Sequence, residues 1–426
     1  MTLQNTERKY DLIVAGGGLS GAAAAISAAR EGLGVLLIER ANCLGGAASN
    51  CLVNPFMPYW TVIRENGAGK KFYLCGGVFR EILGELEAAG ALAADESAFS
   101  EEYLKLILNR MVKKAGADIL FHSYLTGVSK DGETLVSVTV ANKSGTPEFF
   151  ADYFVDATGD ADLAVMSGCP YRLGRDADRL CQPMTLCFRV GNVDMDGFAK
   201  SRGSINTLYA EMQKQGKIRN VREDVLIFEY VAEGVLHFNS TRIVKKNPVD
   251  AFDLTEAEIE AREQVFELYD FLVKNIGGFQ NSRLLATAPQ IGVRESRMID
   301  GEYVLTGGDL ISCKKFADTI AVGNYDIDIH NPEGSGTSHH YFPEGQYYGI
   351  PYRALLPRNA ANLLVAGRCI SVTHEAQASI RIMPIVCCVG EAAGTAAGVA
   401  RRAGVPVRDV DTEELRDILR KRGSVV

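Results

Sequence analysis

The sequence lacks the cysteine spacings of metal-binding modules. Ten cysteines are spread over 426 residues, and no two of them are separated by two residues. Zinc ribbons and ferredoxin-type iron–sulfur sites depend on that spacing, so neither is expected. We predict that most of the cysteines are reduced thiols in the interior, and we predict no metal site.

Positive charge is also in short supply. The formal net charge is −8 at pH 7, which argues against nucleic acid or an anionic membrane as the main partner. Residues 1–9 are polar and mixed in charge, so we predict no secretory signal. Glycine, arginine or proline interrupts every long apolar stretch, which predicts that no segment spans a membrane. These features favour a cytoplasmic protein that is long enough for two or three structural units.

What the sequence does contain is a strand–turn–helix–strand pattern near its start. The run Tyr10–Ala15 reads as a buried strand, and GGGLSG follows at residues 16–21, which fits G-x-G-x-x-G. Helix formers fill residues 22–30, and a second apolar run ends on Glu39. This order of elements is typical of a dinucleotide-binding site. A glycine-rich turn with a purely structural role is the alternative.

Each part of the pattern has a physical role in binding a dinucleotide. Gly16 permits the tight turn, Gly18 lets the backbone approach a pyrophosphate, and Gly21 allows the helix to pack closely on the strand. Leu19 and Ser20 lie at the N-terminus of the helix, where free N–H groups and the helix dipole attract phosphate. The pattern therefore favours a cradle for a dinucleotide.

The acidic residue at the end of the second strand bears on which dinucleotide binds. A carboxylate at Glu39 accepts hydrogen bonds from a ribose 2′-hydroxyl and repels a 2′-phosphate. FAD or NAD therefore fits better than NADP.

Later motifs carry a resemblance to a known group of proteins. Glu39-Arg40 is followed by Leu44-Gly45-Gly46, A-T-G-D stands at residues 157–160, and N-L-L-V-A-G-R stands at residues 362–368. Together these motifs resemble the FAD-binding elements of the large flavoprotein superfamily with glutathione-reductase topology. The resemblance implies that the cofactor is FAD. The residues expected to bind it are Gly16, Gly18, Leu19, Ser20, Gly21, Glu39, Arg40, Gly45, Gly46, Ala157, Thr158, Gly159, Asp160, Gly367, Arg368 and Pro384.

A narrower resemblance spans nearly the whole chain. The sequence is also similar to the FAD-dependent oxidoreductase family of bacterial flavoproteins, through some of the same motifs and several others. The residues that carry this similarity are Leu44-Gly45-Gly46, Val293–Arg297, Gly301-Glu302-Tyr303, Asp328–Pro332, Tyr348–Arg353, Gly367–Ser371 and His374-Glu375.

The resemblance implies an α/β fold with a discontinuous FAD-binding domain. A Rossmann-like domain of the glutathione-reductase type is expected from residues 1–50, 98–165 and 350–426. An inserted α+β substrate domain is expected at residues 166–349, with residues 51–97 alongside as a cap or loop region. Within the expected substrate domain, Thr255-x-x-Glu258 predicts the start of a helix with an apolar face.

Two features of related flavoproteins are missing from the sequence. The region 166–349 contains no second G-x-G-x-x-G, so a separate NAD(P)H domain is not expected. Glutathione-reductase-like enzymes carry a redox cysteine pair after the glycines, but Ala48 and Val53 stand at those two positions. A disulfide mechanism is therefore excluded.

A helix that begins at Pro384 is expected next to the flavin. Proline is favoured in the first turn of a helix, and in related flavoproteins this N-terminus points at the flavin pyrimidine. Gly390, Gly394 and Gly398 recur every four residues and predict close packing against the sheet. A plain buried helix is the alternative.

Candidate catalytic residues follow from side-chain chemistry. His339 and His340 lie in a polar aromatic loop, and histidine exchanges protons near neutral pH. Tyr348 follows shortly after, and a solvated loop is the alternative for this group. Arg381 precedes the Pro384 helix, where a guanidinium group binds a substrate carboxylate.

These observations predict a flavoprotein oxidoreductase. A hydride would pass between flavin N5 and a small polar organic substrate, with a carboxylate as one reading. An electron-transfer subunit that relays electrons to a partner and a flavin monooxygenase are the alternatives. A homo-oligomer is compatible with the sequence, which identifies neither the substrate nor the direction of the reaction.

Overall fold

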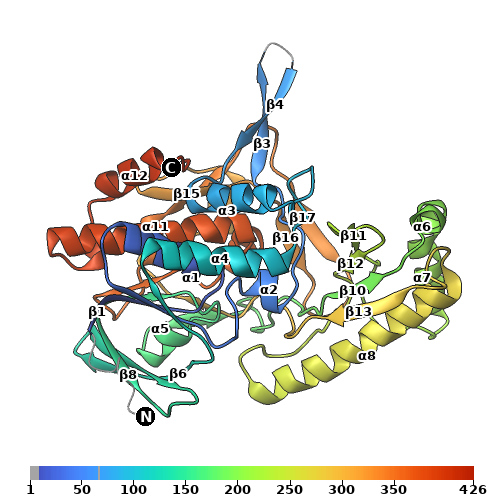
Figure 1. Ribbon diagram of the computed structural model, residues 1–426, viewed down its shortest axis with the longest axis horizontal. Helices are drawn as coiled ribbons and strands as arrows, with labels where there is room; N and C mark the ends of the chain where they lie inside the picture. Colours follow the sequence, from blue (N-terminus) through green and yellow to red (C-terminus); the bar gives the residue numbers. More distant parts are fainter. Residues whose placement is uncertain (1–8, 66–67) are drawn as a thin grey trace.

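The computed structural model describes residues 9–65 and 68–426. Residues 1–8 and 66–67, which we assigned to the FAD-binding domain and to the cap region, lie outside the described residues. Figure 1 shows a larger layered part and a smaller part at the opposite end of the long axis. The predicted domain boundaries stay a prediction.

The larger part is an α/β fold built on a seven-stranded sheet. The strand order is β5-β2-β1-β8-β7-β6, and β19 pairs with β8. The parallel strands are β5 (Asp118–Leu120), β2 (Val35–Ile38), β1 (Tyr10–Ala15), β8 (Glu148–Asp156) and β19 (Leu363–Val365), and the antiparallel strands are β6 (Tyr124–Asp131) and β7 (Thr134–Ala141). All residues of β2 and β19 are buried, as expected for parallel strands covered on both faces.

Two helices cross each other closely on the sheet. They are α1 (Leu19–Arg30) and α11 (Met383–Ala403). A Cβ atom added to Gly390 would lie 2.0 Å from the Ser20 carbonyl oxygen. The glycine stripe therefore lets α11 approach the backbone of α1. The three glycines face α1 and its C-terminal end, so the prediction that this glycine face packs against the sheet was wrong.

Helix α11 also bears on the question of a membrane span. Within the described part of the chain it is the one helix that is long and apolar enough to cross a membrane, and 94% of its most apolar stretch is buried inside the protein. Glycines interrupt this helix as the sequence shows, but they leave it long and apolar enough by length and composition. The burial is that of a core helix.

The smaller part is an antiparallel sheet covered by helices. The strand order is β11-β12-β10-β13. The elements are β10 (Phe188–Gly191), β11 (Ile227–Glu229), β12 (Leu236–Phe238), β13 (Arg283–Thr287), α6 (Met195–Ser201), α7 (Ile205–Lys214) and α8 (Ala251–Asn275). These elements enclose a second apolar core, separate from that of the larger part.

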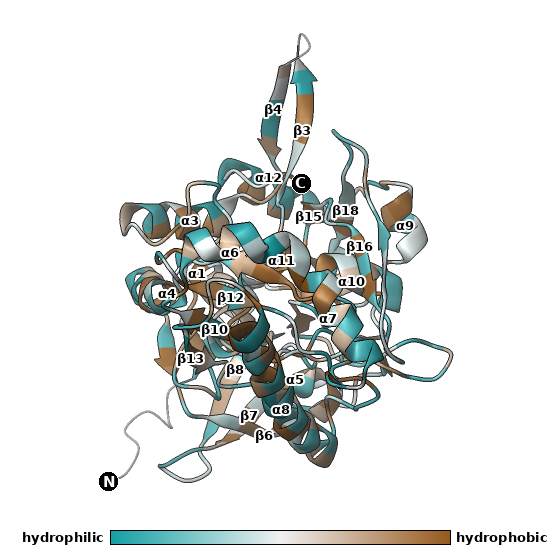
Figure 2. Cartoon of the chain, turned by 90° about the vertical axis from the view of Figure 1, so that its right-hand side faces the viewer, coloured by the Kyte–Doolittle hydropathy of each residue, from teal (hydrophilic) through white to brown (hydrophobic). Residues whose placement is uncertain are grey.

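Helix α8 begins earlier than the sequence pattern predicted. Asp250 caps it by accepting hydrogen bonds from two backbone N–H groups, so the predicted capping box at Thr255 was wrong. Ile259 and Phe266, two apolar residues of this helix, are 53% and 58% exposed, so the buried apolar face does not include them. Figure 2 shows hydrophilic and hydrophobic residues alternating along this helix, which is seen obliquely.

The remaining elements lie outside the two main sheets, and the β3–β4 hairpin projects away from the body of the molecule (Figure 1). The helices are α2 (Ala47–Asn50), α3 (Gly77–Ala88), α4 (Glu101–Ala115), α5 (Asp162–Met166), α9 (Gly307–Ile311), α10 (His374–Ile380) and α12 (Thr412–Lys421), with 3-10 turns at Arg202–Ser204, Tyr352–Leu355 and Val407–Asp409. The strands are β3 (Trp60–Glu65), β4 (Ala68–Tyr73), β9 (Tyr171–Leu173), β14 (Arg297–Ile299), β15 (Thr319–Gly323), β16 (Ile327–His330), β17 (Thr337–His340) and β18 (Tyr348–Pro351).

Candidate functional site

The glycine loop between β1 and α1 is tightly packed at Gly16 and Gly21 and has free space at Gly18. A Cβ atom on Gly16 would lie 2.4 Å from the Ala157 carbonyl oxygen, and one on Gly21 would lie 1.8 Å from the Gly16 carbonyl oxygen. Around Gly18, the nearest atom to an added Cβ is 3.9 Å away. The loop is therefore packed against the sheet at Gly16 and Gly21, and Gly18 presents an accessible backbone.

The N-terminus of α1 offers unsatisfied polar groups beside this opening. Gly18 is the N-cap residue and no side chain caps the helix. The buried hydroxyl oxygen of Ser20 has no hydrogen-bond partner among the residues that the structure describes. Free donors at a helix N-terminus form an anion site, so this end of α1 fits the pyrophosphate of FAD.

A second glycine pair forms a wall against the first loop. The backbone N–H of Gly45 donates to the carbonyl of Gly17 at 2.9 Å. Gly46 has a φ of +54°, and a Cβ atom there would lie 2.8 Å from the Gly18 Cα. Glycine is required at this close approach of two backbones.

Glu39 ties the two loops together. It is buried, and its two oxygens accept hydrogen bonds from the backbone N–H of Gly17 at 2.5 Å and of Ala41 at 2.7 Å. Each carboxylate oxygen keeps a further lone pair, so the residue remains able to accept a ribose hydroxyl. The neighbouring Arg40 is exposed.

The A-T-G-D motif meets the third motif directly. Asp160 accepts hydrogen bonds from Arg368 and from Ser296, both at 2.6 Å. Burial acts to raise the pKa of Asp160, but Arg368 and Ser296 outweigh it and the pKa is lowered. Gly367 has a φ of +95° and lies beside Ser20. The three sequence motifs are therefore brought to one end of the parallel strands.

The remaining residues of these motifs lie in the same region. Thr158 donates to Asp156, and the backbone N–H of Ala157 donates to Ala15 at 2.7 Å. Gly159 has a φ of +83°. Pro384 stands in the first turn of α11, whose N-terminus has no side-chain cap.

A buried carboxylate organises the region that precedes α11. Asp328, on β16, accepts hydrogen bonds from Tyr325 at 3.0 Å and from Arg381 at 3.3 Å through the same oxygen, Oδ2. His330 Nε2 lies 3.3 Å from that oxygen. Burial raises the pKa of Asp328, but these partners outweigh it and hold the pKa well below its ordinary value.

His330 is fixed in its neutral form. Its Nδ1 lies 2.9 Å from a guanidinium nitrogen of Arg242, and because arginine only donates, Nδ1 accepts and Nε2 carries the hydrogen atom. Burial, together with the nearby charge of Arg294, lowers the pKa of His330 to about 3. The side chain therefore positions Asp328 and does not exchange protons near neutral pH.

Positive charge accumulates on the other side of Asp328. Arg294 is buried and donates to the carbonyl of Pro183 at 2.6 Å and to Asn239 at 3.2 Å. Burial, and after it the charge of Arg381, lowers the pKa of Arg294 to about 9. The buried Nε of Arg381 has no hydrogen-bond partner within the described parts of the chain. Two neighbouring guanidinium groups, of which Arg381 keeps a spare donor, fit an anion.

The predicted catalytic residues fall into two groups. His339 and Arg381 both lie at Asp328, with His339 Nδ1 3.8 Å from Asp328 Oδ1. His340 contacts the ring of Phe342, with ring centroids 5.5 Å apart. The structure thus places two of the candidates around one carboxylate.

Tyr348 lies elsewhere, in the core. It is fully buried and its hydroxyl lies 2.6 Å from the Ser379 hydroxyl. Burial raises the pKa of Tyr348 well above its ordinary value.

Sequence reasoning missed a buried polar network beside the arginine pair. Gln182 and Gln377 are hydrogen-bonded at 3.1 Å, and Gln377 donates to the backbone of Arg294 at 2.7 Å. Glu295 accepts from the backbone of Gln182 at 2.8 Å and pairs with His374 at 2.7 Å. Glu295 and His374 lie in the motifs that carry the family resemblance, but no spacing in the sequence indicates that they meet.

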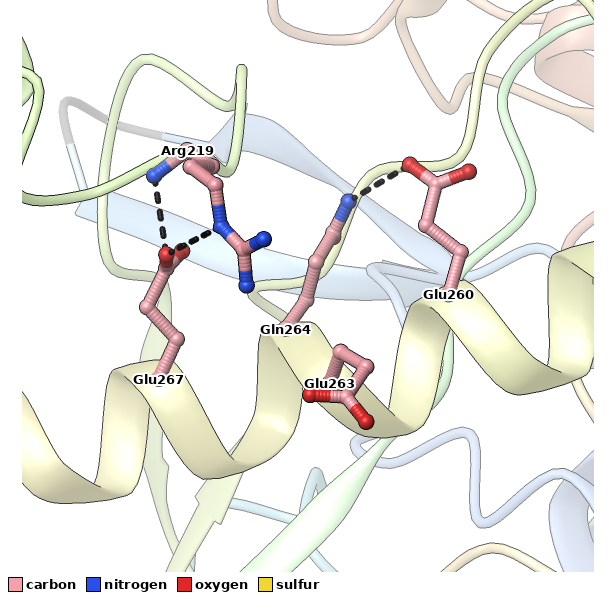
Figure 3. Close-up of a pocket in the computed structure, with 5 residues that line it drawn as sticks. All are labelled: Arg219, Glu260, Glu263, Gln264 and Glu267. Atoms are coloured by element: carbon pink, nitrogen blue, oxygen red, sulfur yellow. Dashed lines mark hydrogen bonds and ion pairs between the residues drawn. The ribbon is translucent and has the colours of Figure 1, made fainter.

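A surface hollow of about 280 Å³ lies along α8, and none of its lining residues belongs to the FAD motifs (Figure 3). Arg219 and Glu267 are paired across it at 3.4 Å, and Gln264 donates to Glu260 at 3.2 Å. Its lining is mainly acidic, which does not suit the phosphates of FAD.

Comparisons with known proteins agree with the geometry. The family model described as FAD dependent oxidoreductase matches residues 11–419. Among similar solved structures, the flavin-dependent brominase Bmp2 is 13% identical with a TM-score of 0.50, and the match covers 96% of this chain and 83% of that one. A geranylgeranyl bacteriochlorophyll reductase-like protein from Thermoplasma acidophilum is 13% identical with a TM-score of 0.48, with 97% and 84% covered. The brominase structure shows a shared fold, and no curated protein matches the chain.

Proposed function

This chain belongs to the FAD dependent oxidoreductase family and its cofactor is FAD, and we propose that it transfers a hydride between the flavin and a small anionic organic substrate. We further propose that the FAD-binding part is of the glutathione-reductase type. The observation that carries the proposal is the pair of guanidinium groups at Asp328, one from the buried Arg294 and one from Arg381, whose side chain is 15% exposed.

The residues that would hold FAD fit it on structural grounds. Gly18 leaves its backbone accessible, and the N-terminus of α1 with the unpartnered Ser20 hydroxyl suits the pyrophosphate. Glu39 keeps lone pairs for the ribose. When bound, FAD supplies the two-electron redox chemistry, and the protein supplies binding, orientation and electrostatics.

The arginine pair would bind and orient the substrate. Arg381 immediately precedes α11, the helix whose N-terminus is expected at the flavin. A carboxylate between Arg294 and Arg381 would neutralise buried positive charge and satisfy the free Nε donor of Arg381. Charge-assisted hydrogen bonds of this kind are short and directional, so they would fix which carbon atom of the substrate faces the cofactor.

Anaerobic reduction of the bound flavin tests this proposal. Matched pairs of small carboxylic acids and their amides are added to the purified holoprotein, and flavin absorbance is followed. We expect one class of acids to bleach the flavin while the matching amides do not. Bleaching by NADH or NADPH alone would favour a reductase or monooxygenase, and a flavin that no organic compound reduces would favour electron relay.

A variant separates substrate binding from FAD binding. Arg381→Gln removes a charged donor, which contributes about 1.5–3 kcal/mol, so kcat/KM for the acid should fall by roughly 10- to 150-fold. Arg262→Gln, an exposed arginine on α8, is the matched control and should leave the kinetics unchanged. Equal kinetics for the two variants would contradict the assignment of Arg381.

A further inference from the structure

The ribbon formed by β16 and β17 places three metal-ligating side chains on one face. Asp328 and His339 are directly opposite each other in the antiparallel register, and His340 is opposite Ile327. Side chains of residues two apart on a strand point to the same side, so Asp326 shares the face of Asp328. One ligand atom from each of Asp326, Asp328 and His339 lies within 4.8 Å of the others.

Asp328 has one oxygen committed and one free. Its Oδ2 atom receives Tyr325, Arg381 and His330. The side chain is only 9% exposed, and its buried Oδ1 atom has no hydrogen-bond partner among the described residues. Burying a carboxylate oxygen without a partner costs free energy. That oxygen points to the side where His339 and Asp326 lie.

We propose that Asp326, Asp328 and His339 form a binding site for a divalent transition-metal ion such as Zn²⁺ or Mn²⁺. Two carboxylates and one imidazole are ligands that these ions accept. Three protein ligands leave further coordination positions for water or substrate, as in catalytic zinc sites. The proposal does not depend on the proposed function, because the ion binds whether or not a substrate is oxidised.

The charges around the three residues agree with a cation. Asp326 pairs only with His339 among the ion pairs of the described residues, so its charge is not balanced by lysine or arginine. Arg381 donates to Oδ2 of Asp328, the committed oxygen, and Arg294 donates to Pro183 and Asn239 instead. A divalent ion would therefore meet Asp328 at Oδ1, the oxygen that Arg381 leaves free.

Binding requires a small rearrangement at the exposed end of the site. His339 Nδ1 and Asp326 Oδ2 are 2.5 Å apart, the distance of a hydrogen bond with one shared proton. Metal ligands at about 2.0–2.1 Å from an ion lie about 3.3 Å apart. The ion would replace the shared proton, which leaves to solvent. His339 is 36% exposed in its side chain and is free to make this shift.

Titration of the FAD-loaded protein with MnCl₂ or ZnCl₂ tests the proposal. Bound Mn²⁺ is counted from the loss of the free-ion electron paramagnetic resonance signal, and Zn²⁺ by calorimetry. We expect one ion per chain. Asp326→Asn and His339→Gln should each weaken binding by more than the roughly 10- to 100-fold that outer-shell substitutions cost.

His340→Gln provides the matched control. His340 is next to His339 on the same strand but opposite Ile327, so this variant should bind the ion as the unaltered protein does. Flavin absorbance and circular dichroism show that each variant keeps its fold. The proposal would be overturned if the unaltered protein bound no ion, or if His340→Gln lost the ion as much as His339→Gln. Neither result would touch hydride transfer.

Discussion

At the scale of single residues, the glycines near the N-terminus have different physical roles. Gly16 and Gly21 are required by backbone packing, because an added Cβ would lie 2.4 Å and 1.8 Å from carbonyl oxygens. Gly18 has a φ of −62°, which any residue adopts, and space around its Cα. Its role therefore concerns the ligand, while the roles of Gly16 and Gly21 concern the fold.

This difference predicts the effect of substituting Gly18. Gly18→Val should fold normally but lose FAD, because the new side chain fills the cradle. Gly21→Val should fail to fold. The ratio of flavin to protein absorbance and the circular dichroism spectrum measure the two effects. Gly84→Ala, on α3 with no atom within 4 Å of an added Cβ, is the control. A Gly18→Val protein that stays yellow would refute the cradle.

The pair Glu295 and His374 predicts how stability depends on pH. Burial acts to lower the pKa of His374, but the hydrogen bond and charge of Glu295 raise it above its ordinary value. A raised folded-state pKa gives stability that is fully present below the unfolded pKa of about 6.5 and is lost as the pH rises through the folded pKa.

Substituting Glu295 should therefore remove part of this dependence. Glu295→Gln should lower the free energy of unfolding by about 1.5–3 kcal/mol at pH 6, the contribution of a hydrogen bond to a charged group. The difference should shrink as the pH rises above the folded pKa of His374. Denaturant unfolding at a series of pH values measures it. A difference that is constant from pH 6 to pH 9 would show that His374 is not charged in the folded protein.

At the scale of elements, the sequence predicted those helices and strands whose ends depend on residues close by in the chain. The pattern at residues 10–39 became β1, α1 and β2, and Asp411, just before α12, accepts hydrogen bonds from two backbone N–H groups of that helix. Helix α8 shows the limit of prediction from nearby residues. Thr255 and Glu258 have capping-box spacing, but Asp250 caps the helix upstream and the Thr255 hydroxyl donates to Ala251.

The competition between these two caps yields a prediction. Asp250→Ala should lower the free energy of unfolding by about 1 kcal/mol, because it leaves two N–H groups of α8 without a partner. Thr255→Ala should have little effect, since this threonine lies inside the helix and bonds within its own turn. Thermal unfolding of both variants measures the difference. Equal losses would mean that α8 begins at Thr255 in solution.

At the scale of the whole molecule, the sequence could indicate the cofactor but not the substrate region. The FAD motifs carry glycine and acidic residues at fixed spacings, so they are visible in one dimension. Asp328 meets Arg381, 53 residues further along, and Arg294 lies near both only because the chain folds back. No spacing in the sequence indicates such a contact, which is why Asp326 and Asp328 were not named as site residues while His339 and Arg381 were.

The two apolar cores are likewise joined by a contact that no local pattern indicates. Arg189 on β10 forms a buried ion pair with Glu101 at the start of α4, and Tyr230 donates to the same carboxylate at 2.8 Å. Both charged side chains are less than one tenth exposed. Loss of one partner would leave the other charge buried without compensation.

This pair predicts non-additive effects on stability. Glu101→Leu should lower the free energy of unfolding by about 3–5 kcal/mol, because Arg189 is left buried and unpaired. Glu101→Leu combined with Arg189→Met should be more stable than Glu101→Leu alone, since both charges are then gone. A double-mutant cycle in denaturant measures the coupling. If the losses in free energy of unfolding for Glu101→Leu alone and Arg189→Met alone simply added in the double variant, the contact between Arg189 and Glu101 would not join the two cores. Each part would then owe its stability to its own interior.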